Sequence, residues 1–494
     1  MTRPMGRQAT GGRTHKVFSF EDRLRLAMFG HWGDALLIPA GVLIAILVTV
    51  HVLLNDRDVG SSMGWMGLAW LSPFAGGLLY VLFGVNRVTR RAHGLRQDGA
   101  LAGRHLASPG PSVAHLVPLG RAAARITARP LLAGNEAQVL YCGDEAYPAM
   151  LRAIAAARHS VALSSYILRD DEAGGAFVDA LIAAHGRGVP VRVLIDGIGA
   201  GYFHSAAFNR LARGGVPAGR FMHSPLPWRM PFLNLRTHKK ILLIDGRIGF
   251  TGGMNIGGEN VLASQPGDPV RDTHFCLRGP VVGQLAEAFA RDWSFVTNEE
   301  LAGADWFPAI AEAGCVNARV ITSGPDADIQ KIEFMVLEAI ACAHHTLRIK
   351  TPYFLPDERL VTALALAALR GVQIDIVLPA RSNHTIMDWA LRANVRPLLQ
   401  RGCRVWLNPP PFDHSKLMVV DGAWSLIGSA NWDARSFRLN FEVNVELYDP
   451  ALAARLTETI DAGKGCELTR EDLAARSLPV RLRDAAARLL LPYL

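Results

Sequence analysis

The sequence has few of the residues that build metal centres and disulfide frameworks. Its six cysteines include no Cys-x-x-Cys motif and no paired spacing with histidine. This scatter argues against a zinc site and a dense set of disulfides, and it is typical of core thiols in a reducing compartment. We therefore expect neither a metal nor another cofactor. The cysteines are Cys142, Cys276, Cys315, Cys342, Cys403 and Cys466.

The chain also lacks an evenly spread positive charge, although its formal net charge is +8. Residues 1–33 carry a net charge of +4 and residues 86–130 a net charge of +7, so the remainder is close to neutral or slightly acidic. A basic surface confined to two stretches indicates a localised anionic partner rather than a nucleic-acid groove. Half of the residues are hydrophobic, which excludes disorder as the main state.

Two long runs lack Asp, Glu, Lys and Arg. Residues 35–54 match the length of about 20 residues that a helix needs to cross a bilayer, and residues 63–85 form a second run. The pair predicts a two-helix transmembrane hairpin. A cleaved signal peptide is disfavoured because 34 residues precede the first run. Buried core helices are disfavoured because two such runs lie next to each other.

The basic residues beside these runs predict an orientation. The short connection between the runs holds only Arg57, whereas Arg87, Arg90, Arg91 and Arg96 follow the second run. Basic residues favour the cytoplasmic side, so both ends of the hairpin are expected there. The sequence thus predicts a multi-pass protein of the cell inner (plasma) membrane, with its catalytic part in the cytoplasm and its arginines against anionic phospholipids.

The rest of the chain repeats a strand, helix, strand pattern. The first copy comprises a strand at residues 160–167, a helix at 176–185 and a strand at 189–195, and the second copy lies at residues 346–350, 357–369 and 372–378. This alternation predicts an α/β fold of two units with mixed sheets. The predicted regions are a basic tail (1–34), the transmembrane hairpin (35–85), a basic linker (86–130), the first unit (131–305), the second unit (306–460) and a C-terminal amphipathic tail (461–494).

A stronger repeat carries the chemistry. The pattern His-x-Lys-x4-Asp occurs twice, each time followed by a Gly-x-x-Asn segment. Chance would supply this pattern about 0.01 times in a chain of this composition, so coincidence is excluded. The candidate catalytic residues are His238, Lys240 and Asp245 in the first copy, and His414, Lys416 and Asp421 in the second.

The spacing assigns roles within each motif. On a strand, the histidine and the lysine two residues later project to one face, while the aspartate falls on the other. The aspartate is therefore interpreted as a structural residue at a hairpin turn. Histidine supplies a nucleophile or an acid near neutral pH, and lysine offers a compact charge to phosphate oxygens. The chain has only seven lysines, and three of them, Lys239, Lys240 and Lys416, fall inside the motifs.

The doubled motif resembles the phospholipase D superfamily, in which two such halves form one active site across a pseudo-two-fold axis. Within it, the sequence is similar to bacterial cardiolipin synthases in three stretches and in the pair of apolar runs. These stretches are Arg271-Asp272-Thr273-His274, Thr351-Pro352-Tyr353-Phe354, and the segment from Gly428 through Asn431-Trp432-Asp433-Ala434-Arg435-Ser436 to Asn440-Phe441-Glu442.

The resemblance implies a phosphatidyltransferase that works through a phosphohistidine without a metal. One histidine attacks the phosphorus of phosphatidylglycerol, and the other protonates the departing glycerol and then deprotonates the second phosphatidylglycerol. It further implies that Asp272 and Glu442 orient the histidines. The residues expected to hold phosphate oxygens, besides the two motif lysines, are Asn255, Asn431 and Ser429.

Several alternatives stay open at this stage. The same motif serves phospholipase D hydrolases and other phosphatidyltransferases, so it defines the reaction class better than the substrate. A non-enzymatic membrane scaffold is disfavoured because both motifs are intact. Tyr166 and Tyr353 fit either the core or the cleft. The helix expected at residues 478–494 fits either a membrane interface or packing on the second unit.

Overall fold

The computed structural model describes residues 20–55, 59–84, 113–199, 201–223, 235–326 and 328–489. The chain divides into two compact units, Met1–Asn86 and Arg87–Leu494. Residues 1–19 of the predicted basic tail and residues 85–112, which include most of the predicted basic linker, lie outside the described residues.

The N-terminal unit is helical. It contains α1 (Phe20–Leu53), α2 (Val59–Leu71), α3 (Pro73–Leu79) and the π-helical turn η1 (Tyr80–Gly84). Val52 from α1 and Trp65 from α2 are buried with Tyr80 in a small apolar cluster. The Tyr80 hydroxyl lies 2.6 Å from Nδ1 of His51, so a polar contact joins the first helix to the last turn.

The predicted two-helix transmembrane hairpin is not found. Among the residues that the structure describes, no helix combines the length and the apolar character that crossing a membrane requires. The second predicted span is divided into α2 and α3 at Ser72–Pro73. Proline has no backbone N–H and restricts the residue before it, so the apolar run does not continue as one helix.

The second unit, Arg87–Leu494, contains both motifs with the candidate catalytic residues and is called the catalytic unit below. It is built on one mixed sheet of 15 strands. The first half supplies β1 (Leu132–Tyr141), β2 (Val161–Ser165), β3 (Val191–Asp196), β4 (Ala218–Phe221), β5 (Ile241–Ile244), β6 (Ile248–Gly252) and β8 (Thr273–Arg278). The second half supplies β9 (Val316–Ser323), β10 (Thr346–Lys350), β12 (Gln373–Pro379), β13 (Arg404–Asn408), β15 (Leu417–Val420), β16 (Trp424–Gly428), β18 (Glu442–Tyr448) and β19 (Cys466–Glu467).

The strand order shows the internal repeat. From the centre outward, the first half runs β1-β8-β6-β5-β2-β3-β4 and the second half runs β9-β18-β16-β15-β10-β12-β13, with β19 added at its edge. The halves meet through the antiparallel pair β1–β9. The outer strands β2–β3–β4 and β10–β12–β13 pair in parallel, and the inner strands are antiparallel. The predicted α/β fold of two repeated units with mixed sheets is confirmed, and the two sheets are fused into one.

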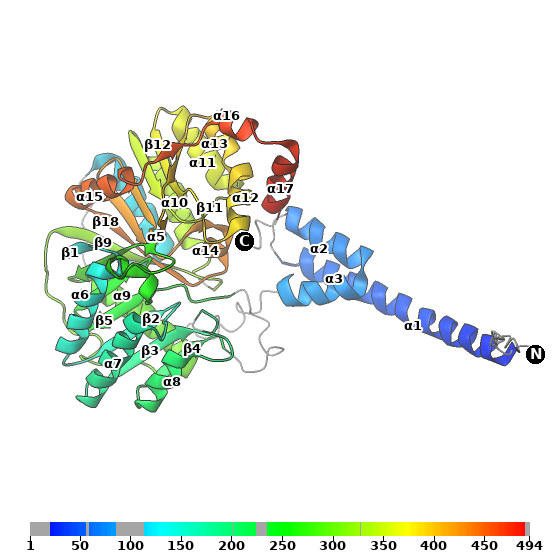
Figure 1. Cartoon of the computed structure of the whole chain (residues 1–494), viewed down its shortest axis with the longest axis horizontal. Coiled ribbons are helices and arrows are strands. Elements are labelled where there is room, and N and C mark those ends of the chain that lie inside the picture. Colours follow the sequence, from blue (N-terminus) through cyan, green and yellow to red (C-terminus); the bar gives the residue numbers. More distant parts are fainter. Residues whose placement is uncertain are drawn as a thin grey trace, which may run out of the picture. The chain divides into compact units, whose positions relative to one another are not determined.

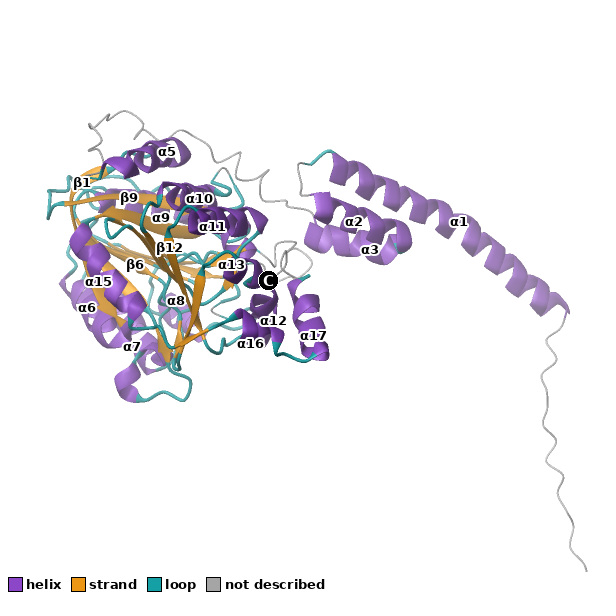
Figure 2. Cartoon of the chain, turned by 90° about the horizontal axis from the view of Figure 1, so that it is seen from above, coloured by secondary structure: helices purple, strands orange, loops and turns teal. Residues whose placement is uncertain are grey.

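Helices cover both faces of this sheet (Figures 1 and 2). One apolar cluster spans both halves and includes α9 (Val281–Thr297) and α15 (Pro450–Asp461). On the other face, α6 (Cys142–Ala156), α7 (Glu172–Gly186) and α8 (Ala206–Arg213) cover the first half. The second half is covered there by α10 (Lys331–Cys342), α11 (Glu358–Leu369), α12 (Thr385–Asn394) and α13 (Arg396–Gln400).

Equivalent helices start with the same capping chemistry. The Asp171 side chain accepts from the Gly174 N–H at the start of α7, and the Asp357 side chain accepts from the Leu360 N–H at the start of α11. A carboxylate there satisfies a backbone donor that has no partner within the helix, and it also complements the helix dipole. The sequence predicted both helices within a few residues of their observed bounds.

The last part of the predicted linker belongs to the fold of the second half. Residues 114–127 form the turn η3 (Ala114–Leu116) and α5 (Val117–Thr127). Leu116, Leu119 and Ala123 recur at helical spacing and are buried in the cluster that contains α10. The C-terminal tail adds α16 (Arg470–Ala474) and α17 (Leu478–Arg488) to the same half.

Candidate active site

The two motif histidines lie in extended segments that end where a strand begins. His238 and Lys240 precede β5, and His414 and Lys416 precede β15. Each strand therefore starts directly after its lysine. The glycines that follow each motif, Gly252 and Gly428, have φ values of 151° and 150°. The two copies of the repeat therefore share the same backbone conformation at this position.

Each motif is docked on the opposite half of the protein. The His238 N–H donates to the carbonyl of Phe441 at 2.8 Å, and the His414 N–H donates to the carbonyl of Arg271 at 2.7 Å. Thr237 forms a parallel bridge with Phe441, and the short strands β14 (Phe412–Asp413) and β7 (Val270–Arg271) also pair in parallel. These backbone contacts bring the two motifs to one site.

The crossed docking gives each histidine a carboxylate from the other half. Nδ1 of His238 lies 3.0 Å from Glu442, and Nδ1 of His414 lies 2.8 Å from Asp272. A carboxylate accepts hydrogen bonds, so it favours the tautomer with hydrogen on Nδ1 and leaves Nε2 free to react. The structure thus brings together the predicted orienting residues, each with the histidine of the other half.

The two lysines are held by the carbonyl groups of their own histidines. Lys240 Nζ donates to the His238 carbonyl at 2.7 Å. Lys416 Nζ donates to the His414 carbonyl and also lies 2.9 Å from Nδ1 of His414. Both side chains are almost fully buried. Burial lowers the pKa of Lys240 to about 7 and that of Lys416 to about 8. A negatively charged phosphate oxygen beside the lysines would favour their protonated forms.

Both motif histidines have pKa values below the usual range, which favours their neutral forms. Burial, together with Lys240 and Lys416, holds the pKa of His238 well below its usual value. Burial and Lys416 lower the pKa of His414 to about 4, although Asp272 opposes this shift. Neutral imidazole is the nucleophilic form, and an approaching phosphate anion would raise both pKa values.

The two carboxylates differ in charge. Burial raises the pKa of Glu442 to about 7, against the opposing effect of Lys240. Burial also acts to raise the pKa of Asp272, but Lys416 and His414 hold it below its usual value. Asp272 is therefore ionised at neutral pH, whereas burial favours the neutral form of Glu442 more strongly.

The Ser429 side chain is hydrogen-bonded to Glu442. Its hydroxyl donates to Glu442 and accepts from the Val443 N–H at 3.0 Å. The prediction that Ser429 binds phosphate is not supported by these contacts, because its donor is already used. At the matching position Gly253, an added Cβ would lie 2.4 Å from Oδ1 of Asp272, so glycine is required there.

The two asparagines have different surroundings. The Asn255 side-chain oxygen accepts from the Ile167 N–H at 3.3 Å. The Asn431 side chain is buried, and its oxygen has no hydrogen-bond partner among the described residues. A buried acceptor without a partner is costly, so this oxygen is available to a hydroxyl or N–H donor of a ligand, but not to a phosphate oxygen.

The motif aspartates are structural, as their spacing predicts. Asp245 accepts from the N–H groups of Arg158, His159 and Ser160 at 2.7 to 3.0 Å. Asp421 accepts from the matching groups of residues 344–346 at 2.7 to 2.9 Å, and His115 lies 2.7 Å away. Both aspartates adopt positive φ values, 53° and 50°, in the turn after the motif strand. They anchor that turn, and their hydrogen bonds go to residues other than His238 and His414.

Two tyrosines line the site. The Tyr166 ring meets the His238 ring edge to face at 5.1 Å, and Lys240 Nζ lies 5.5 Å from its centroid. The Tyr353 ring lies 6.2 Å from the His414 ring in a similar orientation. Of the two readings left open by the sequence, these contacts favour the cleft.

The sequence analysis missed two polar residues beside the site. Asn440 donates to Glu442 at 3.2 Å and so completes the set of donors around that carboxylate. His274 is buried, its Nδ1 has no partner among the described residues, and burial lowers its pKa to about 4. It lines a small cavity with Lys240 and Ser164, whose hydroxyl also lacks a partner in that part of the chain. Both missed residues lie in the stretches that carry the family resemblance.

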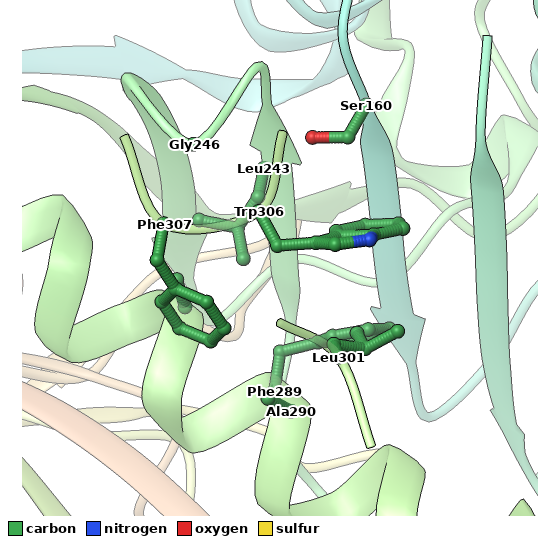
Figure 3. Close-up of a pocket in the computed structure, with 9 residues that line it drawn as sticks. Ser160, Leu243, Gly246, Phe289, Ala290, Leu301, Trp306 and Phe307 are labelled. Atoms are coloured by element: carbon green, nitrogen blue, oxygen red, sulfur yellow. The ribbon is translucent and has the colours of Figure 1, made fainter. Parts of the chain in front are cut away.

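A second small cavity lies at the other end of β5 from His238 (Figure 3). Its lining is mainly apolar and includes Leu243, Phe289, Trp306 and Phe307. The Ser160 hydroxyl at its rim donates to the carbonyl of Asp305 at 2.5 Å. No candidate catalytic residue of the two motifs lines this cavity, which lies in the apolar cluster on the α9 face of the sheet.

Comparison with protein families gives two matches. A family described as "Cardiolipin synthase, PLD-like domain" matches residues 150–293 and 336–462. A second family, described as "Phospholipase_D-nuclease N-terminal", matches residues 43–84. The first match covers both motif histidines, and the second covers most of the apolar N-terminal runs.

Curated relatives match nearly the whole chain. A cardiolipin synthase of Geobacillus kaustophilus is 33% identical over 480 residues, which cover 94% of this chain and 96% of the relative. The major cardiolipin synthase of Bacillus subtilis is 30% identical over 93% of this chain and 99% of its own length. Cardiolipin synthase A of Pseudomonas aeruginosa is 32% identical over 96% of this chain and 99% of its own length.

Among solved structures, a phosphatidylserine synthase of Haemophilus influenzae has a similar fold. The TM-score is 0.58 at 16% sequence identity, over 76% of this chain and all of that chain. At this level of identity the likeness concerns the fold alone.

Proposed function

This chain belongs to the cardiolipin synthase family of the phospholipase D superfamily, and from that premise we propose how its two histidines divide the reaction. The enzyme transfers a phosphatidyl group from one phosphatidylglycerol to another and releases glycerol. The proposal assigns the nucleophile to His238 and the acid–base role to His414. It rests on the different carboxylates behind the two rings.

In the first step, Nε2 of His238 attacks the phosphorus of phosphatidylglycerol. A bond forms between nitrogen and phosphorus, and the bond from phosphorus to the glycerol oxygen breaks. The Nε2–H of His414, in its protonated form, gives its proton to that oxygen, and free glycerol departs. The product is a phosphatidyl-histidine and a neutral His414.

In the second step, a hydroxyl of another phosphatidylglycerol attacks the same phosphorus. Its proton passes to Nε2 of His414, the phosphorus–nitrogen bond breaks, and His238 returns to its starting form. The product is cardiolipin. The proton balance closes because His414 loses one proton in the first step and regains one in the second.

The single observation that carries this division is the crossed pairing of His414 with Asp272 and of His238 with Glu442, two carboxyl groups whose pKa values shift in opposite directions. The acid must hold a proton, and the ionised Asp272 stabilises a positive His414. Glu442 has a pKa raised to about 7 by burial, so it stabilises a positive His238 less. His238 is thus better suited to stay neutral and attack.

Lys240, Lys416, Asn255 and Asn431 are proposed to hold the phosphate oxygens. Both lysine ammonium groups are already fixed by carbonyls beside the reacting rings. Their compact charge offsets the negative charge that grows on the oxygens in the transition state. Asn431 can take part only through its side-chain NH2 group, because its amide oxygen is an acceptor and cannot bind a phosphate oxygen. The absence of a cofactor or metal from the reaction stays a prediction.

Membrane embedding of the N-terminal unit is also proposed. Most of its large apolar side chains between residues 37 and 81 face outward, including Leu37, Leu47, Val59, Trp70 and Leu71. An apolar surface of this extent needs a nonpolar environment, and the anionic phospholipid substrate already places the enzyme at a membrane. The basic residues that follow the apolar runs would lie against anionic headgroups.

The test is to incubate the detergent-solubilised full chain with phosphatidylglycerol alone and to identify the products by mass spectrometry. Equal amounts of cardiolipin and glycerol are expected. Phosphatidic acid as the only lipid product would show that water replaces the second lipid alcohol, and the chain would then act as a phospholipase D hydrolase.

A further inference from the structure

The C-terminal helix α17 is attached to the catalytic unit through its polar side. It packs on α12 (Figures 1 and 2). Asp484, only 3% exposed, pairs with Arg476 and with Arg483, the latter at 2.8 Å. The Arg483 guanidinium also lies 4.3 Å from the ring centroid of Trp389 on α12. The side that carries Asp484 is therefore the buried side, and the stacking of Arg483 on Trp389 joins the helix to α12.

The apolar side of the same helix faces away from the protein. Leu478, Leu482 and Leu489 are 64%, 61% and 79% exposed. At about 3.6 residues per turn, these positions share one face, and Asp484 and Ala487 lie on the opposite face. An amphipathic helix of a soluble domain normally buries its leucines and exposes its charges. Here the arrangement is reversed, so the leucine face is left for another contact.

Two arginines flank the exposed leucines. Arg481 and Arg488 are exposed on one flank of the leucine face, and neither forms an ion pair with any residue that the structure describes. Arg483 lies on the other flank. An apolar face with basic side chains along its borders is the arrangement of helices that lie in the headgroup layer of a membrane.

We propose that this leucine face of α17 docks the catalytic unit on an anionic lipid surface. The leucines enter the boundary between headgroups and acyl chains, and Arg481 and Arg488 meet lipid phosphates. The contact is separate from the apolar surface of residues 37–81, because it belongs to the catalytic unit itself. It fixes one helix of the second half against the lipid layer that holds the substrate.

Charge favours lipid over a second copy of the chain on this face. In a two-fold symmetric contact, the same patch would meet itself, so Arg481 and Arg488 would lie close to the same two arginines of the second copy. Like charges at such a contact are unfavourable. A layer of phosphatidylglycerol presents apolar chains beneath a sheet of negative phosphates. It can therefore accept the leucines and pair with Arg481 and Arg488.

The test uses the full chain reconstituted in phosphatidylglycerol vesicles, with an environment-sensitive fluorophore on one cysteine. The exposed Cys315 and Cys466 are first replaced by serine. Leu482→Cys places the fluorophore on the leucine face, and Ala183→Cys places it at an exposed position of α7 as the control. Lipids brominated near the top of their acyl chains serve as the quencher.

We expect strong quenching and a blue-shifted emission at position 482, and neither effect at position 183. Equal behaviour at both positions would overturn the proposal. A blue shift at 482 without quenching by brominated lipid would also overturn it, because the face would then be covered by protein. The assay needs no turnover, so its outcome does not depend on the division of roles between the histidines.

A second experiment tests whether the contact supports catalysis. The double variant Leu482→Glu, Leu489→Glu changes only exposed side chains, so its melting temperature should match that of the parent. Turnover of phosphatidylglycerol in vesicles is expected to fall severalfold, while turnover of a short-chain phosphatidylglycerol dispersed in detergent stays unchanged. Ala183→Glu is the matched control. Equal vesicle turnover in the double variant and the control would overturn a role for this face in reaching substrate.

Discussion

The two halves of the active site share a motif but surround it with different partners. In the second half, His414 is paired with an Asp272 whose pKa is held below its usual value. In the first half, His238 is paired with a Glu442 whose pKa is raised to about 7. The difference teaches that a repeated motif acquires two chemical roles from its surroundings. A carboxylate with a lowered pKa stabilises the protonated imidazole of an acid, and one with a raised pKa stabilises that protonated form less.

The largest expected effect comes from removing either ring. His238→Ala and His414→Ala should each abolish turnover, because one imidazole cannot be both the covalent nucleophile and the proton carrier. Turnover is measured as cardiolipin formed from phosphatidylglycerol. Substantial activity in either variant would contradict a shared site.

The same pair of variants separates the halves further. With His414 replaced, the first step is slow. No base remains to deprotonate the second phosphatidylglycerol, so the phosphatidyl-histidine intermediate should accumulate. With His238 replaced, none should form. Mass spectrometry of enzyme quenched in alkaline denaturant makes this comparison, because the phosphorus–nitrogen bond is labile in acid, and the reverse pattern would exchange the two roles.

The next effect tests the two carboxylates. Asp272→Asn removes a full charge and disturbs the His414 tautomer, and it should lower kcat/KM by about 100-fold, or about 2.7 kcal/mol of barrier. Glu442→Gln resembles the protonated form already present in part, so a loss of only about tenfold is expected. Equal losses in the two variants would show that the halves do not differ in the way proposed.

Exchange of the first-half lysine should have a smaller effect. Lys240→Arg keeps the charge but replaces a compact ammonium with a wide planar group, so the rate should fall by at least about tenfold. Lysine must be protonated to hold phosphate, and kcat/KM of the parent should therefore decline as the pH rises through about 7 to 8. In the variant this decline should move toward the Lys416 value near 8. A near-native rate would mean that only charge matters at this position.

The smallest effect on turnover is expected for the motif aspartates. Asp245→Asn and Asp421→Asn should leave the turnover of folded enzyme nearly unchanged but lower the free energy of unfolding by about 1 kcal/mol or more. Asp421→Asn should cost more, because it also loses the contact with His115. Thermal melting and turnover per folded molecule are the measurements, and a large loss of turnover at full stability would assign these residues to the chemistry instead.

The stability of the parent should also depend on the pH through Asp421. Burial acts to raise the pKa of this carboxyl, but the N–H groups of residues 344–346 hold it below its usual value. A lowered pKa in the folded state means that the stabilisation is present near neutral pH and is lost as the pH falls through that pKa. Asp421→Asn should therefore lose less stability on acidification than the parent.

Much of the repeat was accessible from the sequence because it is local. The motif histidines and lysines, the turn after each strand, and the outer strands and helices of both halves depend on periodicity and on nearby residues. The strand predicted at residues 346–350 is β10, and the helix predicted at 357–369 is α11 with one residue fewer. The structural role of Asp245 and Asp421 followed from alternation along a strand and agrees with their backbone contacts.

The N-terminal unit shows where such local reasoning failed. Length and lack of charge predicted a second spanning helix, but Pro73 divides that run into α2 and α3. The proline was visible in the sequence. Its effect on the helix was underestimated because hydropathy takes no account of a missing backbone donor.

By itself, the sequence determined that the chain has two phosphate-handling motifs, that each lies in an extended segment, and that α17 has an apolar stripe. Only the tertiary structure decided which partners these features meet. Asp272 and Glu442 each follow one histidine in the chain but orient the other, because Thr237 pairs with Phe441 and β7 pairs with β14 across the halves. The stripe of α17 faces outward because Asp484 and Arg483 form its packed side. Periodicity reports which residues share a face, but contacts between residues far apart in the chain determine which face is buried.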